Sequence, residues 1–216
     1  MEHRVNTRRD FLKKASIAIA FPLAFGCKSD SSAQVADDRL LEKIKANANP
    51  SPSDDYWGAR SAPADVGWRT RLSTDSDKGD RILIGGTIYK VDGKTAAANT
   101  LIYLYHTDAL GIYGRAGEHR HGRYRGWMLT DERGRYEFES ILPASYPNST
   151  IAKHIHMTLT TLEKREEAVD SILFEGDRFL TAREREMHRG GFDPVLRLVK
   201  GSDGIGRGIR DLRLWV

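Results

Sequence analysis

The chain has 216 residues, of which 39% are hydrophobic and 30% are charged, and its formal net charge is +4. This length accommodates one ordinary domain with a substantial core and some extra segments, and it argues against a second full domain. Most of the excess positive charge lies in the first 26 residues. The basic balance is therefore no argument for a nucleic-acid partner, and we expect none.

Residues 1–26 have the layout of an export signal. A basic stretch that contains Arg8 and Arg9 precedes an apolar run over residues 15–25. That run is shorter than the roughly 20 residues that a helix needs to cross a bilayer, so we expect the signal to be removed. The arginine pair and the "DFLK" after it resemble the bacterial twin-arginine signal, whose route carries folded and often cofactor-loaded proteins.

Cys27 is the only cysteine, so an intrachain disulfide is impossible. Its place at the end of the apolar run is typical of a lipoprotein attachment cysteine, although Phe25 stands where small residues are usual. The alternative is a plain cleaved signal with an incidental thiol. Lipidation of Cys27 would tether the protein to a membrane, with a periplasmic or cell-envelope location.

The rest of the chain divides into a tether and one domain. Residues 27–55 are rich in Ser, Asp, Ala, Asn and Pro, which predicts a flexible tether in which a short leucine-bearing stretch could be helical. The domain is predicted over residues 56–216. Its first part, to about residue 80, contains aromatic residues without a period and is expected to be an irregular arm that lies on the domain.

The domain is predicted to be all-β, an antiparallel β-sandwich with an irregular N-terminal arm and short helices. Gly, Asp and Pro residues, including the turn signal Asp92-Gly93, separate short β-rich runs. A short helix is expected at Thr181, where Glu184 completes a capping box. The runs are 82–90, 101–106, 126–130, 135–138, 154–160 and the closing "DLRLWV".

Two histidines and two tyrosines are candidate metal ligands. His154 and His156 share one face of a predicted strand with Cα atoms about 6 to 7 Å apart, a separation at which both imidazoles reach one metal ion. Tyr113 lies in a glycine-punctuated loop, and Tyr146 lies between prolines. Phenolate suits iron(III), whose charge removes the phenol proton well below the free pKa of about 10. The alternative is half-exposed histidines and tyrosines that only pack.

An ordered series of motifs resembles the intradiol ring-cleavage dioxygenases, which include the catechol and protocatechuate dioxygenases. The series runs from about Trp68: "GGTIYKVDGKTAAANTLIYLYHTDALGIY", "YRGWMLTDERGRYEFESILPASYP", "KHIH" and "LFEGD". The resemblance implies a β-sandwich with one non-haem iron(III) held by Tyr113, Tyr146, His154 and His156, with Tyr146 and His156 axial. It also implies that a catechol displaces Tyr146, which accepts a proton, and that O2 cleaves the bond between the hydroxyl-bearing carbons to give a muconate-type product without a reductant or organic cofactor.

The chain departs from the family at Ile151, where the family has an arginine three residues before the first histidine ligand. Loss of one preorganised electrostatic donor can reduce turnover by about 10²- to 10³-fold. Lys153 is expected on the core side of the strand unless the strand begins after it. The other candidate substrate-binding cations are Arg115, Arg123 and Arg125.

A second pair of alternate histidines, His119 and His121, lies in "GEHRHGRYRG". Glycine-flanked basic residues usually hydrate, so this loop is expected to be solvated. Arg120 and Arg123 there could attract anionic aromatics at the rim of the site.

Two other functions stay open at this point. The hairpin region "GGTIYKVDGKTAAANTLIYLY" is also similar to carboxypeptidase-regulatory and transthyretin-like modules, which would need no metal. Alternatively, the chain binds iron but has lost ring cleavage because of Ile151. A homo-oligomer is possible in each case.

Overall fold

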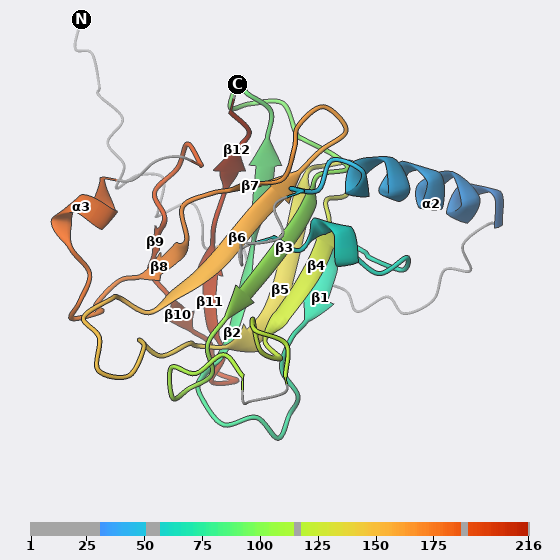
Figure 1. Ribbon diagram of the computed structural model, residues 1–216. Coiled ribbons are helices and arrows are strands. Elements are labelled where there is room, and N and C mark those ends of the chain that lie inside the picture. The colour runs from blue at the N-terminus through green and yellow to red at the C-terminus, as the bar shows by residue number, and fades with distance from the viewer. Residues whose placement is uncertain (1–30, 51–56, 115–117, 187–189, 216) are drawn as a thin grey trace, which may run out of the picture. The chain divides into compact units, whose positions relative to one another are not determined.

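Figure 1 shows the computed structural model, which describes residues 31–50, 57–114, 118–186 and 190–215. The chain divides into two compact units, residues 1–35 and residues 36–216. Of the first unit, the structure describes only the start of helix α2 (Ser31–Lys45). The predictions for the export signal and Cys27 concern residues outside the described ranges.

Two six-stranded sheets build the second unit. The first sheet has the order β1-β5-β2-β11-β10, and β12 also pairs with β2; the second has the order β4-β3-β6-β8-β9, and β7 also pairs with β6. The strands of the first sheet are β1 (Arg69–Arg71), β2 (Arg81–Tyr89), β5 (Arg135–Ile141), β10 (Val199–Lys200), β11 (Gly206–Ile209) and β12 (Leu212–Arg213). Those of the second are β3 (Leu101–His106), β4 (Arg125–Leu129), β6 (His154–Thr160), β7 (Glu167–Ala168), β8 (Ile172–Phe174) and β9 (Val195–Leu196).

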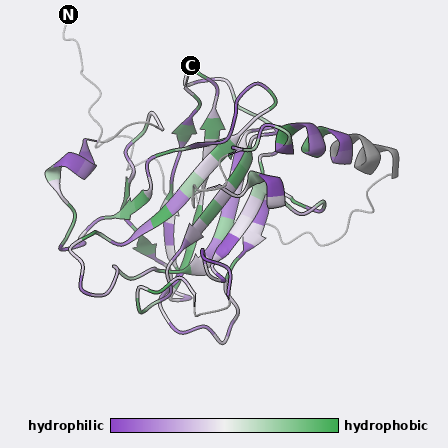
Figure 2. Cartoon of the chain, in the orientation of Figure 1, coloured by the Kyte–Doolittle hydropathy of each residue, from purple (hydrophilic) through white to green (hydrophobic). Residues whose placement is uncertain are grey.

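The main core lies between the two sheets. Ile84 of β2 and Phe138 of β5 belong to the same fully buried cluster as Ile155 and Met157 of β6. Figure 2 shows green bands of hydrophobic residues along β3 and β6, whereas the short helix α3 (Ala182–Arg185) is purple. This packing of sheet on sheet confirms the predicted β-sandwich.

The sheets are mixed, which differs from the antiparallel sandwich that the sequence predicts. The central pairs β2–β5, β3–β4 and β3–β6 are antiparallel, but β1–β5, β2–β11, β2–β12 and β8–β9 are parallel. Side chains alternate between faces in the same way in both kinds of pairing, so the sequence pattern does not reveal strand direction. The capping box at Thr181 and Glu184 forms as predicted.

Residues 36–50 pack on the body, so the folded unit begins before residue 56, where the sequence placed its start. Leu41 and Ile44 of α2 are 3% and 0% exposed, and they form a second cluster with Leu101 of β3 and Ala59 of the short helix η1 (Ala59–Ser61). The apolar positions of α2 therefore cover part of the outer face of the second sheet. In the described ranges, no helix combines the length and the apolar character that a membrane span requires.

A buried carboxylate fastens the arm to this outer face. Glu166 is fully buried, and its Oε1 accepts hydrogen bonds from the backbone N–H groups of Gly58 and Ala59 at 2.8 and 2.9 Å. The same oxygen accepts the hydroxyl of Thr158 of β6 at 2.8 Å. A Cβ at Gly58 would lie 2.4 Å from the ring of Tyr103, so only glycine allows the arm to approach the sheet this closely.

Candidate metal centre

Strand β6 presents two imidazoles on the outer face of the second sheet. Ile155 and Met157 of β6 are buried between the sheets, whereas His154 and His156 are half-buried on the opposite face. The register of the β3–β6 pair places His156 opposite Tyr105 of β3, and the two rings stack with centroids 4.7 Å apart. The alternation in "KHIHMTLT" thus places both imidazoles on one face of the strand, as the sequence predicts.

Two loops bring the tyrosines to these histidines. Tyr113 lies in the loop after β3 and Tyr146 in the loop after β5. The loops are bonded to each other, since the carbonyl of Asp108 accepts the N–H of Ala144 at 3.0 Å. Gly111 has a φ of +81°, and a Cβ there would lie 2.1 Å from the carbonyl oxygen of Ser145. The glycine therefore permits the close approach that holds the two loops together.

Four donor atoms from these residues converge. The Tyr113 and Tyr146 hydroxyl oxygens are 2.6 Å apart, and the Tyr146 oxygen lies 3.0 Å from Nε2 of His154 and 3.5 Å from Nε2 of His156. The two Nε2 atoms are 3.0 Å apart. The tetrad of Tyr113, Tyr146, His154 and His156 thus brings together all the residues that the sequence indicates as metal ligands.

The residue types fit one metal ion, and three of the four distances have a matching spacing, whereas the two phenol oxygens lie at the hydrogen-bond distance of 2.6 Å. Ligands about 2.1 Å from an ion lie about 3.0 Å apart at a right angle and about 3.6 Å apart at 120°. Within the described ranges there is no group of three or more His, Cys, Asp or Glu side chains that could hold a metal. Tyr113 and Tyr146 add two phenol oxygens to the two imidazoles. A phenol that loses its proton becomes a hard oxygen donor, of the kind that suits iron(III).

Burial disfavours the charged form of both imidazoles, and metal binding requires the neutral form. Burial lowers the pKa of His154, and it lowers the pKa of His156 to about 3, with the nearby His154 ring adding to the effect. The Nδ1–H of His154 donates to the carbonyl of Ala152 at 2.7 Å, which leaves the Nε2 lone pair directed at the tetrad. Nδ1 of His156 lies 3.3 Å from the hydroxyl of Ser171, which orients the second ring.

Aromatic rings support the centre from the sheet side. Tyr105 stacks on His121 with centroids 3.8 Å apart, and it also stacks on His156. His121 is only 4% exposed, and its Nδ1 lies 2.5 Å from the hydroxyl of Tyr103. The expectation of a solvated loop is therefore wrong for His121, although His119 is exposed. Its partners lie on β3, where the alternation of "LIYLYH" could have placed both tyrosines on one face.

Of the three arginines that the sequence predicts to face the substrate, two interact with other protein groups and one lies outside the described residues. Arg123 forms an ion pair with Asp77 and lies over the ring of Tyr124. Arg125 donates to the carbonyl of Gly122. Arg115 lies outside the described residues. The structure thus gives no support to Arg123 or Arg125 as a substitute for the arginine that is absent at position 151.

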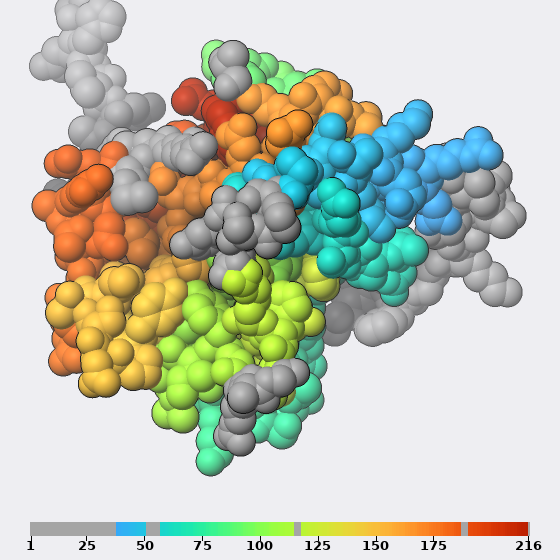
Figure 3. Space-filling view, viewed as in Figure 1, coloured from blue at the N-terminus to red at the C-terminus, as the bar shows by residue number. Residues whose placement is uncertain are grey.

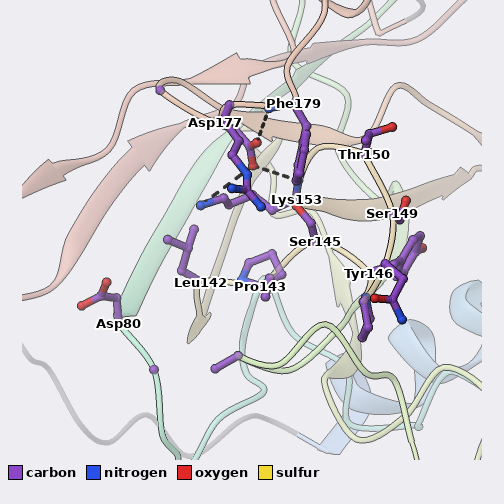
Figure 4. A pocket seen from close by; sticks show the side chains of 17 residues that line it. Asp80, Leu142, Pro143, Ser145, Tyr146, Ser149, Thr150, Lys153, Asp177 and Phe179 are labelled. Atoms are coloured by element: carbon purple, nitrogen blue, oxygen red, sulfur yellow. Dashed lines mark hydrogen bonds and ion pairs between the residues drawn. The ribbon is translucent and has the colours of Figure 1, made fainter.

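A hollow of about 930 Å³ opens beside Tyr146 (Figure 4). Its wall includes Lys153. Strand β6 begins at His154, after Lys153, and in that case the sequence does not require Lys153 to face the core. Ile151 lies in the same loop and is 50% exposed, and its side chain carries no charge.

A sequence profile of the family described as "Dioxygenase" matches residues 53–185. Catechol 1,2-dioxygenase from Acinetobacter baylyi is 33% identical over 104 residues, which are 46% of this chain and 33% of that protein. Catechol 1,2-dioxygenase 2 from Acinetobacter lwoffii is 31% identical over 86 residues, or 39% of this chain and 30% of that protein. The chain thus spans about a third of the length of these curated relatives.

Solved structures share the fold at lower identity. Catechol 1,2-dioxygenase from Acinetobacter sp. ADP1 superimposes with a TM-score of 0.57 and 23% identity, covering 69% of this chain and 57% of that one. The dioxygenase domain of a dioxygenase–carbohydrate-binding protein fusion from Streptomyces sp. SirexAA-E gives a TM-score of 0.54 and 22% identity, covering 70% of this chain and 90% of that domain. These similarities support the β-sandwich assignment.

Proposed function

The chain belongs to the intradiol ring-cleavage dioxygenase family, and on this premise we propose that it is a non-haem iron(III) enzyme that opens catechol-type rings with O2. The single observation that carries the proposal is that the Tyr113 oxygen and the Nε2 atoms of His154 and His156 all lie within 3.5 Å of the Tyr146 oxygen. The bond between the two hydroxyl-bearing carbons would break, both atoms of O2 would enter the product, and the product would be a muconate-type diacid.

The chain's own residues have separable parts in this reaction. Tyr113, His154 and His156 would hold iron(III), which supplies the Lewis acidity that withdraws electron density from a bound catechol and makes its ring reactive toward O2. Tyr146 is the proposed fourth ligand and proton acceptor, because its hydroxyl oxygen is in contact with the other three donors. Ala152 and Ser171 hold the imidazole rings in orientation from behind.

The first test is a visible spectrum of the purified protein with iron quantified on the same sample. We expect one iron per chain and a broad charge-transfer band, because phenolate bound to iron(III) produces such a band. Anaerobic addition of catechol should shift the band to longer wavelength. A protein that stays colourless after reconstitution with iron would contradict the proposal and favour a non-catalytic module. A coloured protein that binds catechol but never cleaves it would instead indicate that turnover was lost, with Ile151 as the candidate cause.

We also propose that the protein is exported by a twin-arginine-like route and tethered through a lipid on Cys27. The order of the basic stretch, the apolar run and the cysteine supports this location. We expect Cys27→Ser to move most of the protein from the membrane fraction to the soluble fraction without changing its iron content. Fractionation of the bacterial envelope measures this shift. An equal distribution of the variant and the parent protein would refute lipidation and leave a plain cleaved signal.

A further inference from the structure

We propose that the hollow beside Tyr146 binds the side chain of an elongated catechol, one whose conjugated side chain ends in a carboxylate, and that Lys153 recognises this carboxylate. The inference rests on the proposed function, because it places the catechol ring at the tetrad. It adds a specificity-determining residue and a substrate class to that centre.

The hollow adjoins the metal centre at Tyr146. Tyr146 belongs to the tetrad and also lines the hollow, and Lys153 directly precedes the ligand His154. Figure 4 shows Tyr146 on one side of the hollow, with Lys153 and Asp177 on another. In Figure 3 the gold segment around residue 150 lies beside the orange segment around residue 180, and these two segments supply much of the wall.

The size of the hollow exceeds what a single ring requires. Its volume is about 930 Å³, near the upper end of the range of about 300 to 1,000 Å³ that is usual for sites that bind drug-sized ligands. A catechol ring held by the tetrad would leave this space for a substituent. The ring of Phe179 and the side chain of Pro143 line the hollow and offer apolar contact to a flat, conjugated side chain.

Two carboxylates and two cations border the hollow, and each carboxylate has partners of its own. Asp177 is directed inward: its side chain is 2% exposed, and it accepts the backbone N–H groups of Lys153 and Phe179 at 3.0 and 2.8 Å. Asp80 is exposed and lies 3.6 Å from the ammonium group of Lys200. Both carboxylates are therefore committed to other groups.

The two cations of the wall remain able to donate. The Lys153 ammonium lies 3.9 Å from Asp177, beyond ordinary hydrogen-bond length, and its side chain is 31% exposed. Arg178 lies over the ring of Phe179 at the exposed edge. Asp177 thus positions Lys153 without saturating its three donors, so a substrate carboxylate can bind there. Lys153 rather than Arg178 is the better anchor, because it is half-buried and adjacent to a proposed ligand.

Anaerobic calorimetry with 3,4-dihydroxycinnamate and its methyl ester tests this assignment. The two probes share the catechol and the conjugated side chain and differ in the negative charge. We expect the intact iron-loaded protein to bind the acid about 10- to 100-fold more tightly than the ester, the effect of one hydrogen bond to a charged group. Lys153→Met should remove this preference, and Lys153→Arg should retain most of it. The ratio of kcat/KM for the two probes should change in parallel.

Lys94→Met is the matched control. It removes the same charge from an exposed turn, directly after Asp92-Gly93, that does not line the hollow. The control should keep the preference of the parent protein for the acid. Equal affinity of the parent for acid and ester, or a preference that survives Lys153→Met, would overturn the proposed subsite. A parent protein that cleaves no catechol at all would overturn the proposed function, while the anaerobic binding ratio would still decide the role of Lys153.

Discussion

Replacing Tyr113 with phenylalanine, or His154 with alanine, will lower the iron content of the purified protein and reduce ring cleavage by about 10³-fold or more. Tyr113→Phe removes one oxygen, which lies 2.6 Å from the Tyr146 oxygen, and His154→Ala removes an Nε2 atom 3.0 Å from it. A bound metal ion contributes several kcal/mol of transition-state stabilisation, and each 1.36 kcal/mol corresponds to about tenfold in rate. Iron per chain and kcat with catechol measure the two effects.

Matched controls are available in the same part of the chain. Tyr124→Phe removes a phenol oxygen that contacts Arg123 and lies on a ring stacked on His106, not on the tetrad. His119→Ala removes an exposed imidazole that accepts the backbone N–H of His121 and, among the described residues, makes no hydrogen bond to the tetrad. Both controls should retain full iron content and most of the activity. Full iron content in Tyr113→Phe and His154→Ala would refute the assignment of these residues as ligands.

The fold was largely predictable because burial imposes a period of two on strands. The alternation in "HIHMTLT" predicts β6 to the residue, and the pattern in "RILIGGTIY" predicts β2 to within one residue. Strand direction was not predictable, because parallel and antiparallel neighbours present the same alternation. The packing of α2 was also missed, since the polar composition of residues 27–55 conceals the few apolar positions, Leu41 and Ile44 among them, that bury its inner side.

For the metal centre, the residue types were predictable from the sequence but the contacts that support them were not. The four proposed ligands were identified from residue types and from the resemblance, but their supporting contacts depend on which strands become neighbours. Tyr105 stacks on His156 only because β3 pairs with β6 in one register. Ser171 reaches His156 from the segment between β7 and β8, fifteen residues further along the chain. The position of Lys153 likewise depends on the residue at which β6 begins, and element boundaries are the least predictable feature of a sequence.

The buried carboxylate of Glu166 leads to the largest expected loss of stability. Glu166→Ala will lower the free energy of unfolding by about 4 kcal/mol or more, because each donor left unpaired in a buried place costs about 1 to 3 kcal/mol. Four donors would lose their acceptor: the backbone N–H groups of Asn49, Gly58 and Ala59, and the hydroxyl of Thr158. Urea unfolding measures the change, through a lower midpoint at an unchanged slope.

A conservative variant shows whether the hydrogen bonds are the cause. Three of the four donors use Oε1 of Glu166, so Glu166→Gln can keep their acceptor and oppose only the Asn49 N–H with its amide NH2 group. Glu166→Gln should therefore retain most of the stability, even if Glu166→Ala folds too poorly to measure. Glu132→Ala, in an exposed turn, is the matched control and should change stability by less than about 0.5 kcal/mol. Equal losses in Glu166→Gln and Glu166→Ala would mean that the negative charge, rather than the acceptor, holds the arm on the sheet.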